Sequence, residues 1–154
     1  MVKVLFVCLG NICRSPTADA VFVKMVAQAG YEREIKVDSA GTGSWHIGEK
    51  PDSRATVLAE RRGYDLSRLR ARQVCAEDFV EFDYILAMDE TNYEDLKLLC
   101  PEEHQAKLHY FLYFAPKLKL RSVPDPYFDN RFEQVLDMVE EAAQGLLDYL
   151  CRKV

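Results

Sequence analysis

The sequence contains no long hydrophobic run and no tract rich in glycine, proline or serine. No apolar stretch approaches the ~20 residues that a membrane-spanning helix requires. The early run Val4–Val7 is too short for the apolar core of a signal peptide and leads directly into a polar loop. We therefore expect no membrane span, no signal peptide and a cytoplasmic location. Because no linker or internal repeat interrupts the chain, we expect one domain over residues 1–154.

Positive charge is also scarce, with 20 Lys and Arg against 25 Asp and Glu and a net charge of −5. Non-specific binding to nucleic acid needs a basic face, so this function is not expected. Five cysteines, an odd number, are typical of free thiols in a reducing compartment rather than of a disulfide framework. The three histidines lie far apart and none has ligand spacing to a cysteine, so we expect neither a metal nor another cofactor.

What the chain does contain is a strand, a loop and a helix at its start. Val2–Val7 is almost continuously apolar, the pattern of a strand buried on both faces, and apolar residues from Ala18 to Ala29 recur at helical spacing. We expect Ser15 to be the N-cap of this helix and Pro16 its first residue. Backbone N–H groups and the helix dipole converge at such a turn, which therefore favours an anion.

Cys8 and Arg14 give this predicted anion site its chemistry. A thiol in a positive field is shifted toward the nucleophilic thiolate, and a guanidinium directs two N–H donors onto a tetrahedral oxyanion. We expect Gly10 and Asn11 to supply positive φ angles for a loop that wraps one phosphoryl group. The Ser15 hydroxyl is placed to donate to the Cys8 sulfur. Either Cys8 or Arg14 alone would more often be structural, but the combined pattern favours a phosphate site.

Strand and helix patterns alternate along the rest of the chain. This predicts an α/β fold with a parallel sheet and right-handed crossovers. We expect four strands in the order 2-1-3-4 with helices on both faces, a flavodoxin-like doubly wound architecture. Ligands bind such sheets at the carboxyl ends of the strands, where Cys8 and the loop that carries Asp125 are both expected. The further strands are expected at 34–38, 84–88 and 108–111, and the further helices from Asp52 to Gly63 and at 76–81, 91–99 and 132–150.

The loop resembles the signature of the low-molecular-weight protein tyrosine phosphatases, which here reads VCLGNICRSP. Further matches are Asp38–Thr42, Trp45-His46, Ala71–Gln73, Ala87–Asp89 with Asn92, and Asp125–Tyr127. The resemblance implies hydrolysis of phosphotyrosine through a phosphocysteine on Cys8, without a metal. It also implies that tyrosine-phosphorylated proteins are the partners and that phosphate is product and inhibitor. We expect a monomer or a weak homodimer.

Asp125, between two prolines, is the candidate general acid and base. From the residues alone it could equally be a turn-forming aspartate, and the resemblance favours the acid. We expect the loop from Leu9 through Gly10, Asn11, Ile12 and Cys13 to Ser15 to bind phosphate. Leu9 and Ile12, together with Trp45 and Tyr127, are expected to wall a slot for a tyrosine ring. The family often has a second tyrosine where this chain has Phe128, which removes a hydroxyl. Ser39 and Asn92 correspond to positions that brace the loop.

Two questions stay open at this stage. An arsenate reductase on the same scaffold is the alternative enzyme, but its chemistry uses two further cysteines close in sequence, whereas Cys75, Cys100 and Cys151 are far apart. A phosphate-binding module without catalysis would need neither the thiol nor the acid. Cys13 either packs beneath the loop or forms a reversible disulfide with oxidised Cys8, and the sequence does not decide between these.

Overall fold

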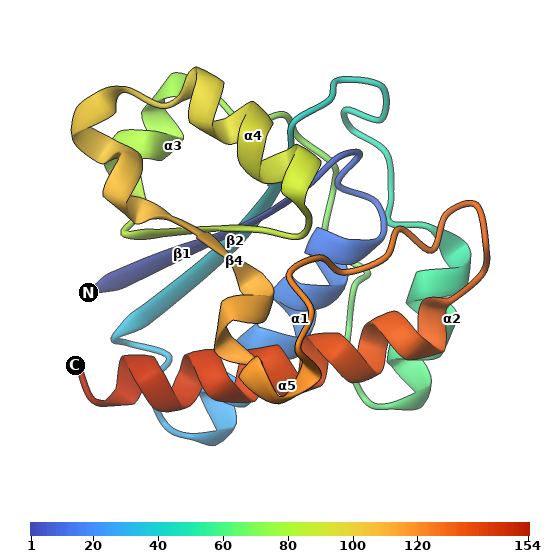
Figure 1. Cartoon of the computed structure of the whole chain (residues 1–154). Helices are drawn as coiled ribbons and strands as arrows, with labels where there is room; N and C mark the ends of the chain where they lie inside the picture. Colours follow the sequence, from blue (N-terminus) through green and yellow to red (C-terminus); the bar gives the residue numbers. More distant parts are fainter.

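The computed structural model describes residues 1–154 and contains one sheet of four parallel strands in the order β2-β1-β3-β4, which confirms the predicted topology. Helices cover both faces of this sheet (Figure 1). The elements, in chain order, are β1 (Val2–Cys8), α1 (Arg14–Gln28), β2 (Ile35–Gly41), α2 (Ser53–Arg61), α3 (Ala76–Glu81), β3 (Tyr84–Ala87), α4 (Glu90–Leu99), η1 (Glu102–Lys107), β4 (Leu108–Tyr110), η2 (Phe111–Phe114), η3 (Pro116–Leu118) and α5 (Phe132–Cys151).

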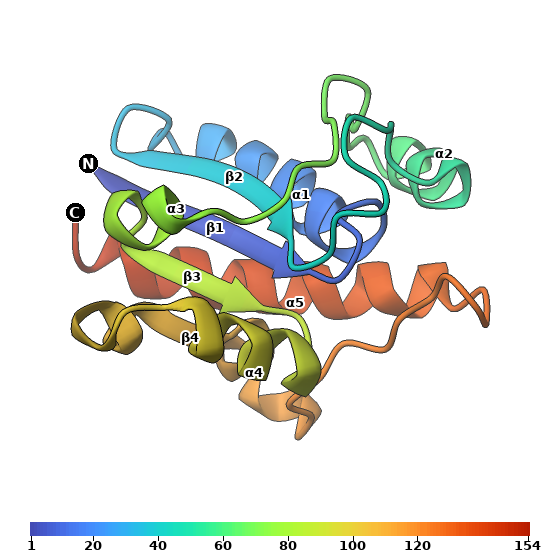
Figure 2. The same ribbon diagram turned by 90° about the horizontal axis from the view of Figure 1, so that it is seen from above.

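Strand β1 lies at the centre and its alternating side chains enter two different cores. Val4 and Phe6 belong to the larger core, which α1 and α5 close, whereas Leu5 and Val7 belong to a second core beneath α3 and α4. All four side chains are fully buried. Figures 1 and 2 show these helix pairs on opposite faces of the sheet. The continuous apolar run of the first strand is therefore the consequence of burial on both faces.

The parallel register places several strand ends at one edge of the sheet. Cys8, the last residue of β1, pairs with Gly41 at the end of β2, and Val7 pairs with Ala87 at the end of β3. Strand β1 has β2 on one side and β3 on the other, so the order in which strands are added to the sheet reverses at β1. This is the kind of switch point at which α/β sheets bind ligands.

The ends of two helices test the capping predictions. Asp52 caps α2, as predicted, by accepting a hydrogen bond from the Arg54 N–H. Ser15, in contrast, was wrongly predicted as the cap of α1, because the helix already begins at Arg14. The Ser15 hydroxyl is engaged by the loop instead. Pro16 was predicted to be the first residue of the helix but is the third, where it is tolerated because N–H groups of the first turn have no partner within the helix.

The last helix carries the longest apolar stripe of the chain. Ten of the 20 residues of α5 are buried, and they include Val135, Leu136, Val139 and Leu146. This face packs on α1 and on η2. No helix of the structure, α5 included, has both the length and the apolar character needed to cross a bilayer.

Candidate active site

The loop after β1 curls around the sulfur of Cys8. The Asn11 N–H donates to Cys8 Sγ at 3.2 Å, and Ser15 Oγ lies 3.0 Å from the same sulfur. Cys8 is 3% exposed, so its sulfur faces solvent only through the mouth of the loop. The sulfur thus accepts a hydrogen bond from its own loop, and a cysteine acts as a nucleophile in its thiolate form.

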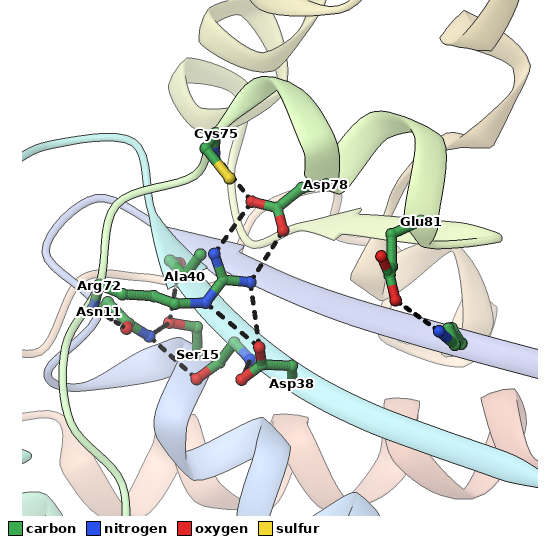
Figure 3. Close-up of polar contacts among 10 residues, drawn as sticks. Asn11, Ser15, Asp38, Ala40, Arg72, Cys75, Asp78 and Glu81 are labelled. Atoms are coloured by element: carbon green, nitrogen blue, oxygen red, sulfur yellow. Dashed lines mark hydrogen bonds and ion pairs between the residues drawn. The ribbon is translucent and has the colours of Figure 1, made fainter.

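Asn11 holds this loop in place from beneath. Its backbone takes the left-handed conformation, with φ of 57°, as predicted. Its amide nitrogen donates to Ser15 Oγ at 2.7 Å and to Ser39 Oγ at 3.1 Å, and its amide oxygen accepts from the Arg72 N–H at 2.9 Å. Figure 3 shows these contacts, which connect α1, β2 and the segment before α3. The side chains of Asn11 and Ser15 therefore face the protein interior and not the cavity.

Gly10 does not have the predicted positive φ. A Cβ at this position would lie 3.0 Å from His46 Cδ2, which is closer than packed carbons tolerate without movement of the neighbour. Close approach of the His46 ring, rather than backbone conformation, is therefore the constraint at position 10. Asn92 does not show the expected bracing contact, because its Oδ1 is buried without a hydrogen-bond partner.

Arg72 braces the same region through its side chain. Its guanidinium bonds both oxygens of Asp78 at 3.0 Å and lies 3.0 Å from Asp38 Oδ2 (Figure 3). Asp78 is in α3 and Asp38 is in β2. The bidentate contact orients the Arg72 backbone, whose N–H binds Asn11. Two carboxylates therefore fix the Arg72 side chain, although a third of its surface is exposed.

Arg14 is the one arginine that is almost completely buried at the site, with 2% of its surface exposed. Its Nη1 donates to Asp89 Oδ2 at 2.6 Å and to the Val123 carbonyl at 3.0 Å. Its Nη2 lies 3.6 Å from Asp125 Oδ2. Burial opposes the charged form, but the Cys8 sulfur and the Asp89 carboxylate outweigh it, so the pKa of Arg14 is raised above its ordinary value.

A cavity of about 220 Å³ opens above these groups. Most of the predicted site residues line it, whereas the side chains of Asn11 and Ser15 are buried beneath it. Side chains in the wall are mostly apolar or aromatic, and Cys8, Arg14 and Asp125 supply the chemistry. The lining residues are Cys8, Leu9, Gly10, Ile12, Cys13, Arg14, Trp45, His46, Asp125, Tyr127 and Phe128.

Asp125 lies at the edge of this cavity, with a third of its side-chain surface exposed. Its Oδ1 accepts the Tyr127 N–H at 3.1 Å, and its Oδ2 faces Arg14. One carboxyl oxygen is thus used by its own loop, while the other is directed to the site. A carboxyl group in this position can exchange a proton with a molecule bound above Cys8.

Sequence reasoning gave no role to His46 and Asp89. His46 lines the cavity and its Nδ1 lies 3.1 Å from Glu49 Oε2. Asp89 caps α4 through the Asn92 N–H and binds Arg14. The position of Asp89 immediately after a buried strand was a usable signal, because that strand ends at the same edge as Cys8. For His46, the one signal was its place beside Trp45 in a segment that matches the family.

Cys13 lies in the cavity wall and is 5% exposed. Burial, followed by the charge of Asp52, raises the pKa of the Cys13 thiol well above its ordinary value. Cys13 is therefore a neutral thiol at physiological pH. No cluster of three or more potential metal ligands occurs in the structure.

Comparison with known proteins gives a consistent result. The profile of the family "Low molecular weight phosphotyrosine protein phosphatase" matches residues 3–154. The low molecular weight protein-tyrosine-phosphatase YfkJ of Bacillus subtilis is 41% identical over 96% of this chain and 94% of its own length. A putative low molecular weight protein-tyrosine-phosphatase of Synechocystis is 44% identical over 99% of this chain and 98% of its own length.

Solved structures agree with these sequence matches. The crystal structure of a protein tyrosine phosphatase from Entamoeba histolytica covers 99% of both chains with a TM-score of 0.95 and 41% identity. The match therefore extends over the whole fold and is not confined to the loop around Cys8. The chain belongs to the low molecular weight phosphotyrosine protein phosphatase family.

Proposed function

We propose that this protein tyrosine phosphatase hydrolyses phosphotyrosine in proteins through a covalent phosphocysteine on Cys8. The observation that carries the proposal is the convergence of Cys8, Arg14 and Asp125 on one cavity. Loop N–H groups and the Arg14 guanidinium bind the phosphoryl oxygens and stabilise their charge in the transition state.

The first step transfers the phosphoryl group to the enzyme. The Cys8 thiolate attacks phosphorus and forms a phosphorus–sulfur bond while the bond to the phenolic oxygen breaks. Asp125, protonated at this stage, gives its proton to the departing phenolate. This proton transfer matters because an unprotonated tyrosine phenolate is a poor leaving group.

The second step regenerates the enzyme. Asp125, now a carboxylate, removes a proton from water, whose oxygen attacks phosphorus and breaks the bond to Cys8. Inorganic phosphate and the Cys8 thiolate are the products. One carboxyl group therefore acts as acid and then as base, and no metal ion is needed to balance either step.

The cavity supports aromatic rather than aliphatic substrates. Leu9, Ile12, Trp45 and Tyr127 stand around the mouth of the loop and leave room for a ring between them and Cys8. A phosphoserine side chain is shorter than phosphotyrosine and has no ring to contact the apolar walls of the cavity. Phe128, 84% exposed at the rim, keeps the wall without the hydroxyl of a tyrosine.

The arsenate reductase alternative is not supported. Cys75 is exposed at the start of α3, Cys100 is buried at the end of α4, and Cys151 lies in the last turn of α5. Each of these thiols lies in or next to a different element. The chain therefore lacks the two further cysteines, close in sequence, that arsenate reduction uses. Five free cysteines support a reducing, cytoplasmic compartment, and we propose that the protein acts there as a monomer or weak homodimer.

Replacement of the nucleophile tests the mechanism. Cys8→Ser should abolish hydrolysis of p-nitrophenyl phosphate and of a phosphotyrosine peptide, because a hydroxyl is a far weaker nucleophile than a thiolate. The variant should still bind phosphate. A matched phosphoserine peptide and thiol-dependent reduction of arsenate serve as controls and should give no turnover with wild type. Near-wild-type hydrolysis by Cys8→Ser would refute the phosphocysteine mechanism.

A further inference from the structure

The side chain of Arg54 joins the start of α2 to the loop that carries Asp125. Its Nη1 donates to Asn130 Oδ1 at 2.7 Å and its Nη2 donates to the Tyr127 carbonyl at 3.2 Å. Asn130 and Tyr127 are 76 and 73 residues away in sequence. The guanidinium thus holds the segment that directly follows Asp125 by two separate hydrogen bonds.

Two aromatic rings lie within cation–π distance of this guanidinium. Its Cζ lies 4.7 Å from the centroid of the Phe132 ring and 5.4 Å from that of Tyr127. Phe132 is the first residue of α5 and is 9% exposed. Arg54 therefore stacks on both ends of the segment 127–132, and stacking of this kind adds to the hydrogen bonds.

On the other side, Asp52 connects Arg54 to the phosphate loop, which is the segment 9–13 between β1 and α1. The Asp52 N–H donates to the Ile12 carbonyl at 2.8 Å, and the Asp52 carboxylate accepts from Arg54 Nε at 3.1 Å and from Nη2 at 2.9 Å. Burial opposes ionisation of Asp52, but the hydrogen bonds from Arg54 outweigh it and lower the pKa of Asp52 below its ordinary value. The pair stays charged, and one continuous set of contacts runs from Ile12 to Tyr127.

Before Asp125 the chain is anchored at Val123, whose N–H donates to the Met88 carbonyl at 2.7 Å and whose carbonyl accepts from Arg14 at 3.0 Å. A backbone hydrogen bond from the Asn130 N–H to the Pro126 carbonyl closes the turn, in which Asn130 takes a left-handed conformation with φ of 59°. The Asp125 carboxyl itself contacts the Tyr127 N–H and lies 3.6 Å from Arg14. After Asp125, the hydrogen bonds that reach this turn from outside come from Arg54.

We propose that Arg54 is a positioning residue that holds the Asp125 loop in register with the phosphate loop, so that acid and nucleophile act on the same substrate. Arg54 is not among the residues that line the cavity, so we assign it no contact with the reacting atoms. The inference rests on the proposed function, in which Asp125 protonates the leaving group. Loss of Arg54 then removes acid catalysis while the phosphate loop remains intact.

The test is a leaving-group series on Arg54→Met, which keeps an apolar stem without the hydrogen bonds. The measured quantity is kcat/KM, since it reports the steps up to departure of the phenol. For phosphotyrosine and phenyl phosphate, kcat/KM should fall about 10- to 100-fold, a large part of what acid catalysis contributes. For p-nitrophenyl phosphate, whose leaving group is stable as an anion, the fall should stay within about 3-fold.

Two further variants and a measurement of thermal unfolding distinguish a positioning role of Arg54 from a loss of folding. Arg54→Lys keeps the charge but cannot make the forked contacts, so its defect should have the same dependence on leaving group. Arg61→Met, at the exposed end of the same helix, is the matched control and should behave as wild type in both assays. Thermal unfolding confirms that each variant is folded at the assay temperature.

A double mutant separates this inference from the proposed function. If Arg54 acts through Asp125, adding Arg54→Met to Asp125→Asn should slow phosphotyrosine cleavage by less than about 3-fold more. An equal loss for all leaving groups, or full additivity with Asp125→Asn, would overturn the positioning role while leaving the mechanism on Cys8 intact. Failure of the mechanism itself would appear separately, as activity retained by Cys8→Ser.

Discussion

Among individual residues, several buried polar side chains act at a distance from the cavity. Asn11, Ser15 and Ser39 share hydrogen bonds beneath the phosphate loop, and they are 2%, 0% and 4% exposed. A buried polar network of this kind is stable only when its members are satisfied, so it specifies one loop conformation. The rigidity that a phosphate cradle needs therefore comes from residues that the substrate does not touch.

Asp19 is a further buried acid, located in α1 and 3% exposed. Burial, and secondly the charge of Asp38, raise the pKa of Asp19 from 3.8 to about 7. Between these values the folded protein binds a proton here that the unfolded chain has lost. The free energy of unfolding should therefore fall as pH rises from about 4 to about 7, by on the order of 1 kcal/mol per unit from this residue.

Asp19→Asn should remove this component, because the amide stays neutral at every pH. Urea unfolding of both proteins at pH 5, 6, 7 and 8 measures the effect as a difference. The stability of the Asp19→Asn variant relative to the wild type should grow with pH up to about 7 and then level off. Parallel stability curves for the two proteins would show that Asp19 does not contribute this pH dependence.

Cys13 is the residue for which sequence alone left two readings. A thiolate is the form of cysteine that peroxide oxidises, and a sulfenic acid formed on Cys8 can react with the Cys13 thiol to give a disulfide and water. We predict that peroxide inactivation of the wild type is reversed by dithiothreitol and is slowed by phosphate. Cys13→Ser should keep its activity but lose it irreversibly under peroxide. Recovery of this variant to the wild-type level would leave Cys13 with a packing role only.

At the scale of elements, α5 shows how a helix without site residues supports the site. Its buried face closes the core against α1, and it also presses on η2. Gly145 makes this contact possible, because a Cβ at this position would lie 1.9 Å from the Phe114 carbonyl oxygen. The helix and the backbone of η2 are therefore closer than any larger residue permits.

Gly145→Ala should destabilise the protein by about 1–3 kcal/mol, the usual cost of forcing extra atoms into a packed contact. This outcome opposes the helix propensity of alanine, which alone would stabilise an exposed position by about 1 kcal/mol. Glu141→Ala, at an exposed position of the same helix, is the control and should change stability little. Urea denaturation measures both, and a more stable Gly145→Ala protein would contradict the predicted contact.

At the scale of the whole molecule, the site unites segments from both ends of the chain. Cys8 and Arg14 come from the first strand and helix, whereas Asp125 and Tyr127 come from the segment before the last helix. A ligand that binds only this assembled arrangement must stabilise the folded state as a whole.

Inorganic phosphate should therefore raise the midpoint of thermal unfolding. At about 100 times its dissociation constant, the added stability is about 2.7 kcal/mol. Cys8→Ser should keep this shift, and Arg14→Lys should lose most of it, because an ammonium group cannot make the planar two-point contact. Chloride at matched ionic strength is the control. An equal shift with chloride, or none with phosphate, would argue against the phosphate site.

Local sequence patterns were sufficient for much of this architecture. The buried run of β1, the apolar stripe of α5 and the Asp52 cap all depend on neighbours within a few residues, so they are readable from the chain. The alternation of strands and helices predicted a parallel sheet with right-handed crossovers. The strand order 2-1-3-4 was a further hypothesis, which the structure confirms. The clustering of Cys8 and Asp125 at one sheet edge followed from the same rules, and the resemblance then supplied their roles.

Contacts between distant segments were decided only by the tertiary structure. Ser15 was predicted to be a helix cap, but the Cys8 sulfur and the Asn11 amide engage its hydroxyl. Gly10 was predicted to serve a turn, but the His46 ring limits the size of this residue. The contacts of Arg54 with residues 76 and 73 positions away leave no trace in local spacing. Periodicity reports which face of an element is buried, whereas the partner of a polar side chain depends on which distant segment folding brings beside it.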